Sequence, residues 1–337
     1  MAAGAVTGAN TTIVLSDLTK LSPMVWLDGA RVASEQYQNV MDLVDTDNLD
    51  QFNRDYGSIA AGGFGEVTSE GADYQVQTHN QGDTLSLAVV KRTSAYSITE
   101  DLTDGNKYRE ALGNMRNLGE RLFRTRARDV VHHIFTFGFS TTYTDSSGAT
   151  VTNGVANAST EAIFADTHTM ADTSTYDNLL ADTAIGEANL RSLVDLTTGF
   201  LDEDGYRVPW GAGSEKLLLT SEDVPMMHAG ARLTTQEWNY SSQNRDINVF
   251  RGQYMHTPLF FLNTLATGAI DTTKDKYYIV VDRSLMKRLA IFADHTKPTL
   301  SGPFEDNWNG GMLWRAKTRY DKGVQAAHIG AGCAATT

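Results

Sequence analysis

The chain has almost no capacity for covalent or metal cross-links. A single cysteine, Cys333, occurs among its 337 residues, which excludes an internal disulfide and a cysteine-rich zinc site. No segment approaches the ~18 apolar residues of a transmembrane helix, and the N-terminus lacks the basic and apolar parts of a signal peptide. With 41% apolar residues the chain can still fill a sizeable core. We therefore expect a protein that is made and folded in a cytoplasm.

Positive charge is also scarce. The chain has 28 Lys and Arg against 41 Asp and Glu, a net charge of −13, so its surface as a whole should repel a phosphate backbone. The balance is uneven, because residues 1–105 hold 5 basic and 15 acidic side chains, whereas residues 107–128 hold 7 and 2. This pattern favours pairing of an acidic N-terminal region with a basic segment, within one chain or between copies. Ordinary solvated faces are the alternative reading.

The motifs of common enzyme classes are missing. The sequence has no Gly-Lys-Ser/Thr phosphate loop, no Gly-x-Ser-x-Gly elbow and no His-Glu-x-x-His zinc pattern. A glycine-rich segment, 62–67 (GGFGEV), with Lys91 downstream is similar to part of a kinase site. However, Arg128-Asp129 lacks the preceding histidine, and no Asp-Phe-Gly follows. We expect no catalytic residue and no cofactor.

Metal binding is disfavoured on similar grounds. His132 and His133 are helical neighbours about 100° apart, so they cannot both face one ion. Asp166 and His168, with Asp172 nearby, could hold a cation, but hydrogen bonding is the commoner role of such residues in a polar loop. The acidic stretch 42–55 lacks the oxygen ligand followed by glycine of a calcium loop. We expect no metal site.

A long β-hairpin is predicted by the alternation of side chains from about residue 64 to residue 98. Its two arms flank a turn at 79–83 (HNQGD), and about 15 residues per arm would reach ~50 Å. A lone two-stranded ribbon is marginally stable in water, so its apolar face needs a surface to cover it. We expect that surface on a second copy of the chain. The hairpin residues assigned to this contact are Tyr74, Val76, Leu85, Leu87 and Val89.

One long helix is predicted from about residue 106 to residue 137. Leu112, Met115, Leu118 and Leu122 recur at helical spacing and form one stripe. At 1.5 Å per residue the helix would be ~48 Å long. Two internal glycines lower its intrinsic stability, so packing must hold it. Its basic residues Arg121, Arg124 and Arg128 are assigned to contacts between copies.

The rest of the chain alternates shorter helices and strands, which indicates an α+β fold. Residues 1–55 read as an extended arm with a short helix at 34–43. A helix is expected at 187–200 and another from a cap near Ser221, with strands at 216–220, 259–262 and 277–281. Further strands are expected at 289–298 and 312–329.

This order of elements resembles the Hong Kong 97-type capsid protein of tailed phages, with its N-arm, E-loop hairpin, P-domain with a long spine helix, and A-domain. The segments 163–168 (IFADTH), 176–180 (YDNLL) and 217–220 (LLLT) running into 224–231 (VPMMHAGA) look like the Mu-like head-subunit branch. Near the end, 278–282 (YIVVD), 291–293 (IFA) and 315–324 (RAKTRYDKGV) resemble the final strands of that family.

The resemblance implies five regions: an N-terminal arm (1–55), an E-loop hairpin (56–98), a spine helix (99–140), an A-domain with connecting loops (141–283) and returning P-domain strands with the C-terminus (284–337). It also implies a major head protein that assembles in the host bacterial cytoplasm, as hexamers and pentamers, into the icosahedral shell of the virion. The partners would be scaffold, portal and possibly decoration proteins, with non-specific proximity to packaged double-stranded DNA and no membrane.

Two alternatives remain open: an encapsulin-type compartment, and an α/β hydrolase whose hairpin is a lid. The sequence departs from the family's covalent chainmail, because residues 64–90 contain no lysine to form the cross-link.

Overall fold

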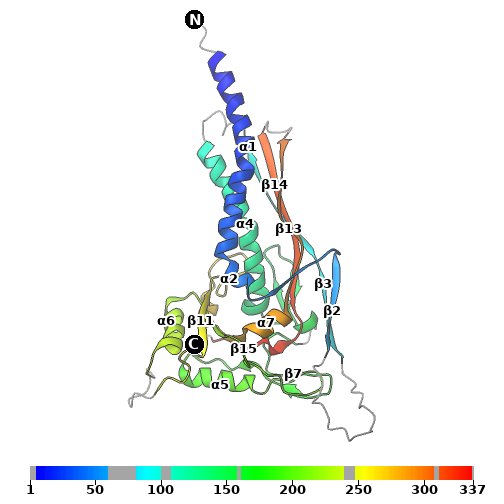
Figure 1. The fold of residues 1–337 in the computed structure, drawn as a ribbon, viewed down its shortest axis with the longest axis vertical. Coiled ribbons are helices and arrows are strands. Elements are labelled where there is room, and N and C mark those ends of the chain that lie inside the picture. Colours follow the sequence, from blue (N-terminus) through cyan, green and yellow to red (C-terminus); the bar gives the residue numbers. More distant parts are fainter. Residues whose placement is uncertain are drawn as a thin grey trace, which may run out of the picture.

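The computed structural model describes residues 5–59, 81–99, 108–157, 161–238, 247–306 and 311–335. The molecule is elongated (Figure 1). Two long helices and a long pair of strands run along its length, and shorter helices and strands form a broad base. None of the described helices is both long and apolar enough to cross a membrane.

The two long helices pack along each other. They are α1 (Ala5–Gln36) and α4 (Tyr108–Val131), and α4 continues as a short π-helical turn, His132–Thr136. Two glycines bring the backbones together: a Cβ atom on Gly119 would lie 2.3 Å from the carbonyl oxygen of Trp26, and one on Gly29 would lie 2.3 Å from that of Arg116. The helices therefore cross where neither has room for a side chain.

The first of these helices corrects the prediction of an extended N-terminal arm. Only a short helix at 34–43 was expected, whereas α1 spans 32 residues and is followed by α2 (Gln38–Met41). Its buried face carries Trp26, Ala30 and Ala33, spaced four and three residues apart, and Tyr37 continues this face just after the helix ends. Because two of these residues are alanines, the face has a weak hydropathy signal although its spacing is helical.

The predicted stripe of the second long helix is confirmed. Met115, Leu118 and Leu122 are buried, together with Trp26 of α1 and Trp314 of the neighbouring sheet. The first member of the stripe, Leu112, is only half-buried. The predicted bounds of 106–137 agree with the combined α4 and π-helical segment.

A four-stranded sheet lies against these helices, in the order β1 (Asp45–Asn48), β13 (Ala290–Asp306), β14 (Gly311–Val324) and β4 (Val90–Ile98). The central strands β13 and β14 are antiparallel, β4 is antiparallel to β14, and β1 runs parallel to β13. The prediction that residues 90–98 belong to a hairpin arm is wrong, since β4 pairs with β14 from Val90↔Tyr320 to Ile98↔Met312.

A five-stranded sheet forms the base, in the order β11 (Tyr254–Leu259), β10 (Lys216–Ser221), β12 (Tyr278–Asp282), β15 (Gly330–Cys333) and β9 (Leu179–Leu180). The helices of this region are α5 (Glu187–Thr197), α6 (Val224–Thr235) and α7 (Arg283–Leu289). The expected strands at 216–220 and 277–281 and the helix at 187–200 are confirmed.

Three details of this base differ from expectation. The strand expected at 259–262 is displaced, because β11 ends at Leu259 and the residues that follow it form a turn. The helix expected to be capped near Ser221 has Asp223 at its N-cap. The C-terminal residues of β15 join the five-stranded sheet, whereas they were expected to stay with the returning strands.

A separate antiparallel pair, β2 (Asn53–Ile59) and β3 (Gln81–Ala88), projects at one side of the base (Figure 1). The turn expected at 79–83 is displaced, because Gln81, Gly82 and Asp83 lie within β3. Smaller pairs join β5 (Thr142–Thr144) to β6 (Thr150–Thr152) and β7 (His168–Thr169) to β8 (Thr175–Tyr176).

A buried ion pair ties the long helix to the four-stranded sheet. The Arg126 guanidinium of α4 donates to the Asp294 carboxylate of β13 at 2.6 Å, and both side chains are almost fully buried. The same guanidinium lies 4.9 Å from the ring centroid of Phe292 and 5.8 Å from that of Tyr320. A charge is stable in this interior only because its counter-ion and the ring faces replace water.

Candidate subunit-contact surfaces

The apolar face of the hairpin is covered by the chain itself. Leu85 is 0% exposed and Leu87 is 2% exposed, and Val89 packs half-buried against the same cluster. The leucines lie over Gly323 of β14, where a Cβ atom would be 2.7 Å from Leu85 Cδ1 and 3.0 Å from Leu87 Cδ2. The cluster is completed by Leu49, Ala156, Ile291 and Ala293.

The prediction that a neighbouring copy covers Leu85 and Leu87 is therefore wrong. Its premise was that the ribbon has no surface of its own, but this part of the ribbon folds back over β14 and the sheet beneath it. The opposite face of β3 is exposed and polar, with Thr84 and Ser86, and Ser86 donates to Asp55 of β2 at 2.6 Å. Tyr74 and Val76 lie outside the described residues.

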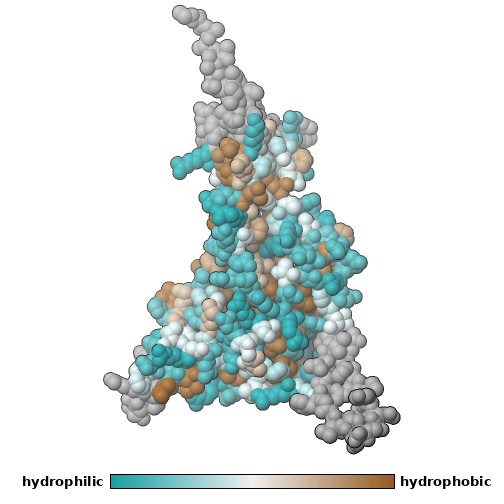
Figure 2. All heavy atoms as spheres, in the orientation of Figure 1, coloured by the Kyte–Doolittle hydropathy of each residue, from teal (hydrophilic) through white to brown (hydrophobic). Residues whose placement is uncertain are grey.

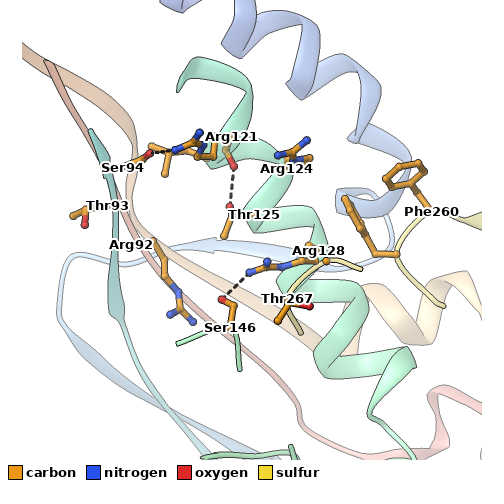
Figure 3. A pocket seen from close by; sticks show the side chains of 13 residues that line it. Arg92, Thr93, Ser94, Arg121, Arg124, Thr125, Arg128, Ser146, Phe260 and Thr267 are labelled. Atoms are coloured by element: carbon orange, nitrogen blue, oxygen red, sulfur yellow. Dashed lines mark hydrogen bonds between the residues drawn. The ribbon is translucent and has the colours of Figure 1, made fainter. Parts of the chain in front are cut away.

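Three predicted arginines converge on a cleft of about 570 Å³. Arg121, Arg124 and Arg128 come from successive turns of α4, and Arg92 faces them from β4 (Figure 3). The remaining wall comes from the β5–β6 turn and the segment after β11, which contribute Ser146, Phe260, Phe261, Thr267 and Gly268. The cleft thus combines guanidinium groups, hydroxyl groups and one aromatic edge.

These arginines differ in how far the chain neutralises them. Arg128 lies 3.0 Å from the Asp129 carboxylate, and Arg92 lies 3.5 Å from Asp129 and 3.6 Å from Asp145. Among the described residues, the Arg121 guanidinium donates only to the hydroxyl oxygen of Ser94, at 3.1 Å. Arg124 is exposed and has no ion pair with a residue that the structure describes. The cleft has more positive than negative charge and can hold an anion.

Two more arginines of the basic segment, Arg116 and Arg126, are used within the chain. Arg116 lies 3.6 Å from Asp28 of α1 and 3.4 Å from Glu120, and Arg126 is paired with Asp294. The expected pairing of an acidic N-terminal region with the basic helix thus occurs inside one chain for Arg116. This surface pair is worth only about 0–1 kcal/mol.

The hydrogen-bonding role expected of His168 is confirmed. Its Nε2 lies 3.0 Å from Asn178 Oδ1, and its Nδ1 lies 3.3 Å from the Glu161 carboxylate. The hydrogen bond from His168 lowers the pKa of Glu161, against the opposing effect of burial. Asp172 instead caps its own turn by accepting from Ser174. In the ranges that the structure describes, no three His, Cys, Asp or Glu side chains are grouped to hold a metal.

The paired histidines of the long helix lie in different surroundings. His132 Nε2 is 2.7 Å from the Thr264 hydroxyl, and burial, followed by the charge of Arg128, lowers its pKa to about 3. Burial also lowers the pKa of His133 well below its ordinary value, with a smaller contribution from Lys322. Both rings are neutral near pH 7 and are part of the core.

The architecture can be compared with that of known proteins. No family model matches the chain, and no curated protein sequence matches it. Among solved structures, the capsid of an empty GTA particle matches with a TM-score of 0.52 and 12% identity, over 87% of this chain and 88% of that one. The capsid of cyanophage P-SCSP1u gives 0.51 and 11%, over 87% and 86%. The capsid of Myoviridae phage XM1 gives 0.50 and 12%, over 87% and 90%.

The chain has the capsid-protein fold. The predicted Hong Kong 97-like fold class is thereby confirmed. The match lies in the arrangement of the helices and strands, because the sequences are only 12% identical. Within this capsid fold the arginine cleft lies between the long helix α4 and strand β4, at an edge of the four-stranded sheet. Of the residues assigned to subunit contacts, the structure groups the arginines at one surface and places Leu85 and Leu87 in the core.

Proposed function

We propose that this chain is the major capsid protein of a tailed phage, which assembles with copies of itself into the icosahedral shell around double-stranded DNA. The observation that carries the proposal is the fold, shared over 87% of the chain with capsid subunits of phages and of a GTA particle. Fold alone does not fix function, but the proteins named by these matches are all shell components.

The regions take the roles that the resemblance assigns them. We assign α4 as the spine helix, the β2–β3 pair as part of the E-loop, and the five-stranded sheet with α5 and α6 as the A-domain. The four-stranded sheet is the P-domain sheet, so β4 belongs to the P-domain and β15 to the A-domain. Helix α1 takes the place of the N-arm.

The exposed surface is suited to contacts between copies. Hydrophobic residues gather beside α1 on the upper part of the visible face (Figure 2), and Leu21, Met24 and Leu27 of that helix are 44%, 67% and 58% exposed. Such side chains recur at helical spacing and favour burial against another surface. Arg121, Arg124 and Arg128 add a cationic cleft, and we assign all three to subunit contacts.

A structural role is also consistent with the chemistry of the described polar groups. The buried histidines are hydrogen-bonded or enclosed in the core, and the 570 Å³ cleft presents arginines and hydroxyls without a nucleophile paired to a base. We propose no catalytic step. Scaffold, portal and decoration proteins are the further partners that a phage shell would need.

The test is electron microscopy of the purified protein, combined with sedimentation and nuclease-protected DNA measurements on particles from infected cells. Closed shells of uniform size containing genome-length double-stranded DNA are expected. Closed shells that package protein cargo and no genome would assign the chain to an encapsulin-type compartment instead. A protein that remains monomeric under all conditions, and is absent from virions, would refute the proposal.

A further inference from the structure

The four-stranded sheet carries opposite charge at its two edges. Its order is β1-β13-β14-β4, so β1 and β4 are the edge strands. Strand β4 contributes Arg92, Thr93 and Ser94 to the arginine cleft. Strand β1 lies in the acidic run 42–55, which holds five aspartates and one arginine. The two charged edges are separated by β13 and β14 and are offset along them, because β1 pairs with residues 291–294 of β13, whereas residues 92–94 of β4 pair with residues 316–318 of β14.

The acidic edge has carboxylates that the chain leaves unpaired. Asp47 is paired with Arg54 at 2.8 Å and accepts from Tyr56. Asp45, in β1, and Asp50, just after it, are exposed, and their carboxylates form no ion pair or hydrogen bond with a described side chain. Exposed carboxylates beside an unpaired strand edge discourage pairing with a neutral strand but suit a cationic partner.

The cationic edge is the matching half. Arg124 has no ion pair among the described residues, and Arg121 has only the Ser94 hydroxyl. Their guanidinium groups border the 570 Å³ cleft, with the hydroxyl groups of Thr125 and Ser146 beside them (Figure 3). A guanidinium group binds a carboxylate by charge-assisted hydrogen bonds, which are about twice as strong as neutral ones.

We propose that the arginine cleft of one subunit binds the Asp45–Asp50 edge of a second copy, so that subunits join head to tail through opposite edges of this sheet. The proposal rests on the shell function above and names one of its contacts. Because two different surfaces meet, the contact is heterologous, and repetition closes a ring when the rotation between subunits permits. In a closed ring, the cleft of every subunit binds one neighbour, and its acidic edge binds the other.

A second copy fits the cleft better than nucleic acid does. A duplex would extend over many subunits and meet the whole surface of a protein whose net charge is −13, which repels it. A neighbouring copy brings only its acidic edge to the cleft, and charges beyond about 8–10 Å are screened at physiological salt. The arginines are also clustered in a recess beside Phe260 and Phe261, where an inserted side chain can reach them.

Charge reversal tests the contact. Arg124→Glu should raise the protein concentration needed for half-maximal shell assembly by about tenfold or more, as measured by sedimentation and electron microscopy. Asp50→Lys should do the same. The double variant Arg124→Glu/Asp50→Lys restores opposite charges across every contact and should recover assembly. Arg109→Glu, exposed near the start of the same helix, and Asp166→Lys, exposed just before β7, make the same charge changes outside the cleft and the acidic edge and should assemble like the wild type.

The outcomes separate this contact from the shell function. Normal assembly of Arg124→Glu, or a double variant no better than either single one, would overturn the contact while leaving the shell proposal intact. Arg124→Glu shells that form normally but fail to retain DNA would make nucleic acid the occupant. Circular dichroism melting of each variant should match the wild type, because Arg124 and Asp50 are exposed. If the wild type forms no shells, it is the proposed function that fails.

Discussion

Replacing Gly119 by alanine should destabilise the subunit, although the same change usually stabilises a helix. Alanine is favoured over glycine inside a helix by about 0.8–1 kcal/mol. At this position, however, the new Cβ would lie 2.3 Å from the carbonyl oxygen of Trp26 and 2.9 Å from the backbone nitrogen of Ala30. Backbone atoms cannot rotate away as a side chain can, so α1 as a whole must move. Overpacking of this kind typically costs about 1–3 kcal/mol.

The same helix contains its own control. A Cβ atom on Gly113 would meet nothing within 4 Å, and the residue is exposed, so Gly113→Ala should gain the full helix preference. Because both variants gain the same helix preference, their free energies of unfolding should differ by the overpacking cost alone, about 1–3 kcal/mol, with Gly119→Ala the less stable. Gly29→Ala, whose Cβ would lie 2.3 Å from the Arg116 carbonyl oxygen, should behave like Gly119→Ala.

Urea unfolding of the unassembled subunit, followed by tryptophan fluorescence, measures these differences. Trp26 is 5% exposed at the helix crossing and reports its opening. The subunit must be kept unassembled, because association would stabilise every variant by mass action. If Gly119→Ala is at least as stable as Gly113→Ala, the two helices do not cross at these glycines and the packing described for α1 is wrong.

Three further predictions concern the core, the hairpin and the shell. Met115→Asp buries a charge in a fully enclosed site, costs several kcal/mol and should give insoluble protein, so soluble, correctly assembled particles would contradict the core assignment. Leu87→Asp should lower the melting temperature of the isolated subunit, whereas Thr84→Asp on the exposed face of β3 should not; equal melting of both would place Leu87 outside the core. Intact shells boiled in detergent should run as a single-chain band, because residues 64–90 contain no lysine for a chainmail bond; a ladder of non-reducible multimers would refute this.

The long helix could be predicted from the sequence because its stripe is made of large apolar side chains. Met115, Leu118 and Leu122 recur at three and four residues, and this local pattern alone determines both the helix and its buried face. The strands at 216–220 and 277–281 could be predicted as well, since each contains a short unbroken apolar run, 217–219 and 277–281. These elements can be predicted without knowing what they pack against.

Helix α1 and the pairing of the hairpin could not be read in this way. The buried face of α1 includes Gly29, Ala30 and Ala33. These small residues let the helices approach closely, but they contribute little to a hydrophobic pattern in the sequence. Residues 81–98 alternate throughout, but alternation does not say which strand is the partner. The first half of this stretch pairs with β2 and the second half with β14, and only the tertiary fold decides between them.

The arginine cleft was only partly foreseeable. The density of arginines between residues 116 and 128 is visible in the sequence. Whether each arginine lies in the core, in a surface ion pair or at the cleft depends on the side of α4 from which it projects, relative to α1 and β13. Arg92 and the wall around Phe260 come from distant segments and carry no motif, so nothing in the sequence links them to the cleft.

The buried ion pair of Arg126 and Asp294 fixes the register of the long strand β13, which the hydrophobic pattern of that strand does not. If β13 slid by two residues along its neighbours, every side chain would keep the same face and the apolar core would still be covered. Both ions would then lose their partner inside the protein, at a cost of about 3–5 kcal/mol. A strand of 17 residues, Ala290–Asp306, with bulges at several points, is thereby held in one alignment against the helix. A chain in which β13 is misaligned is therefore penalised during folding.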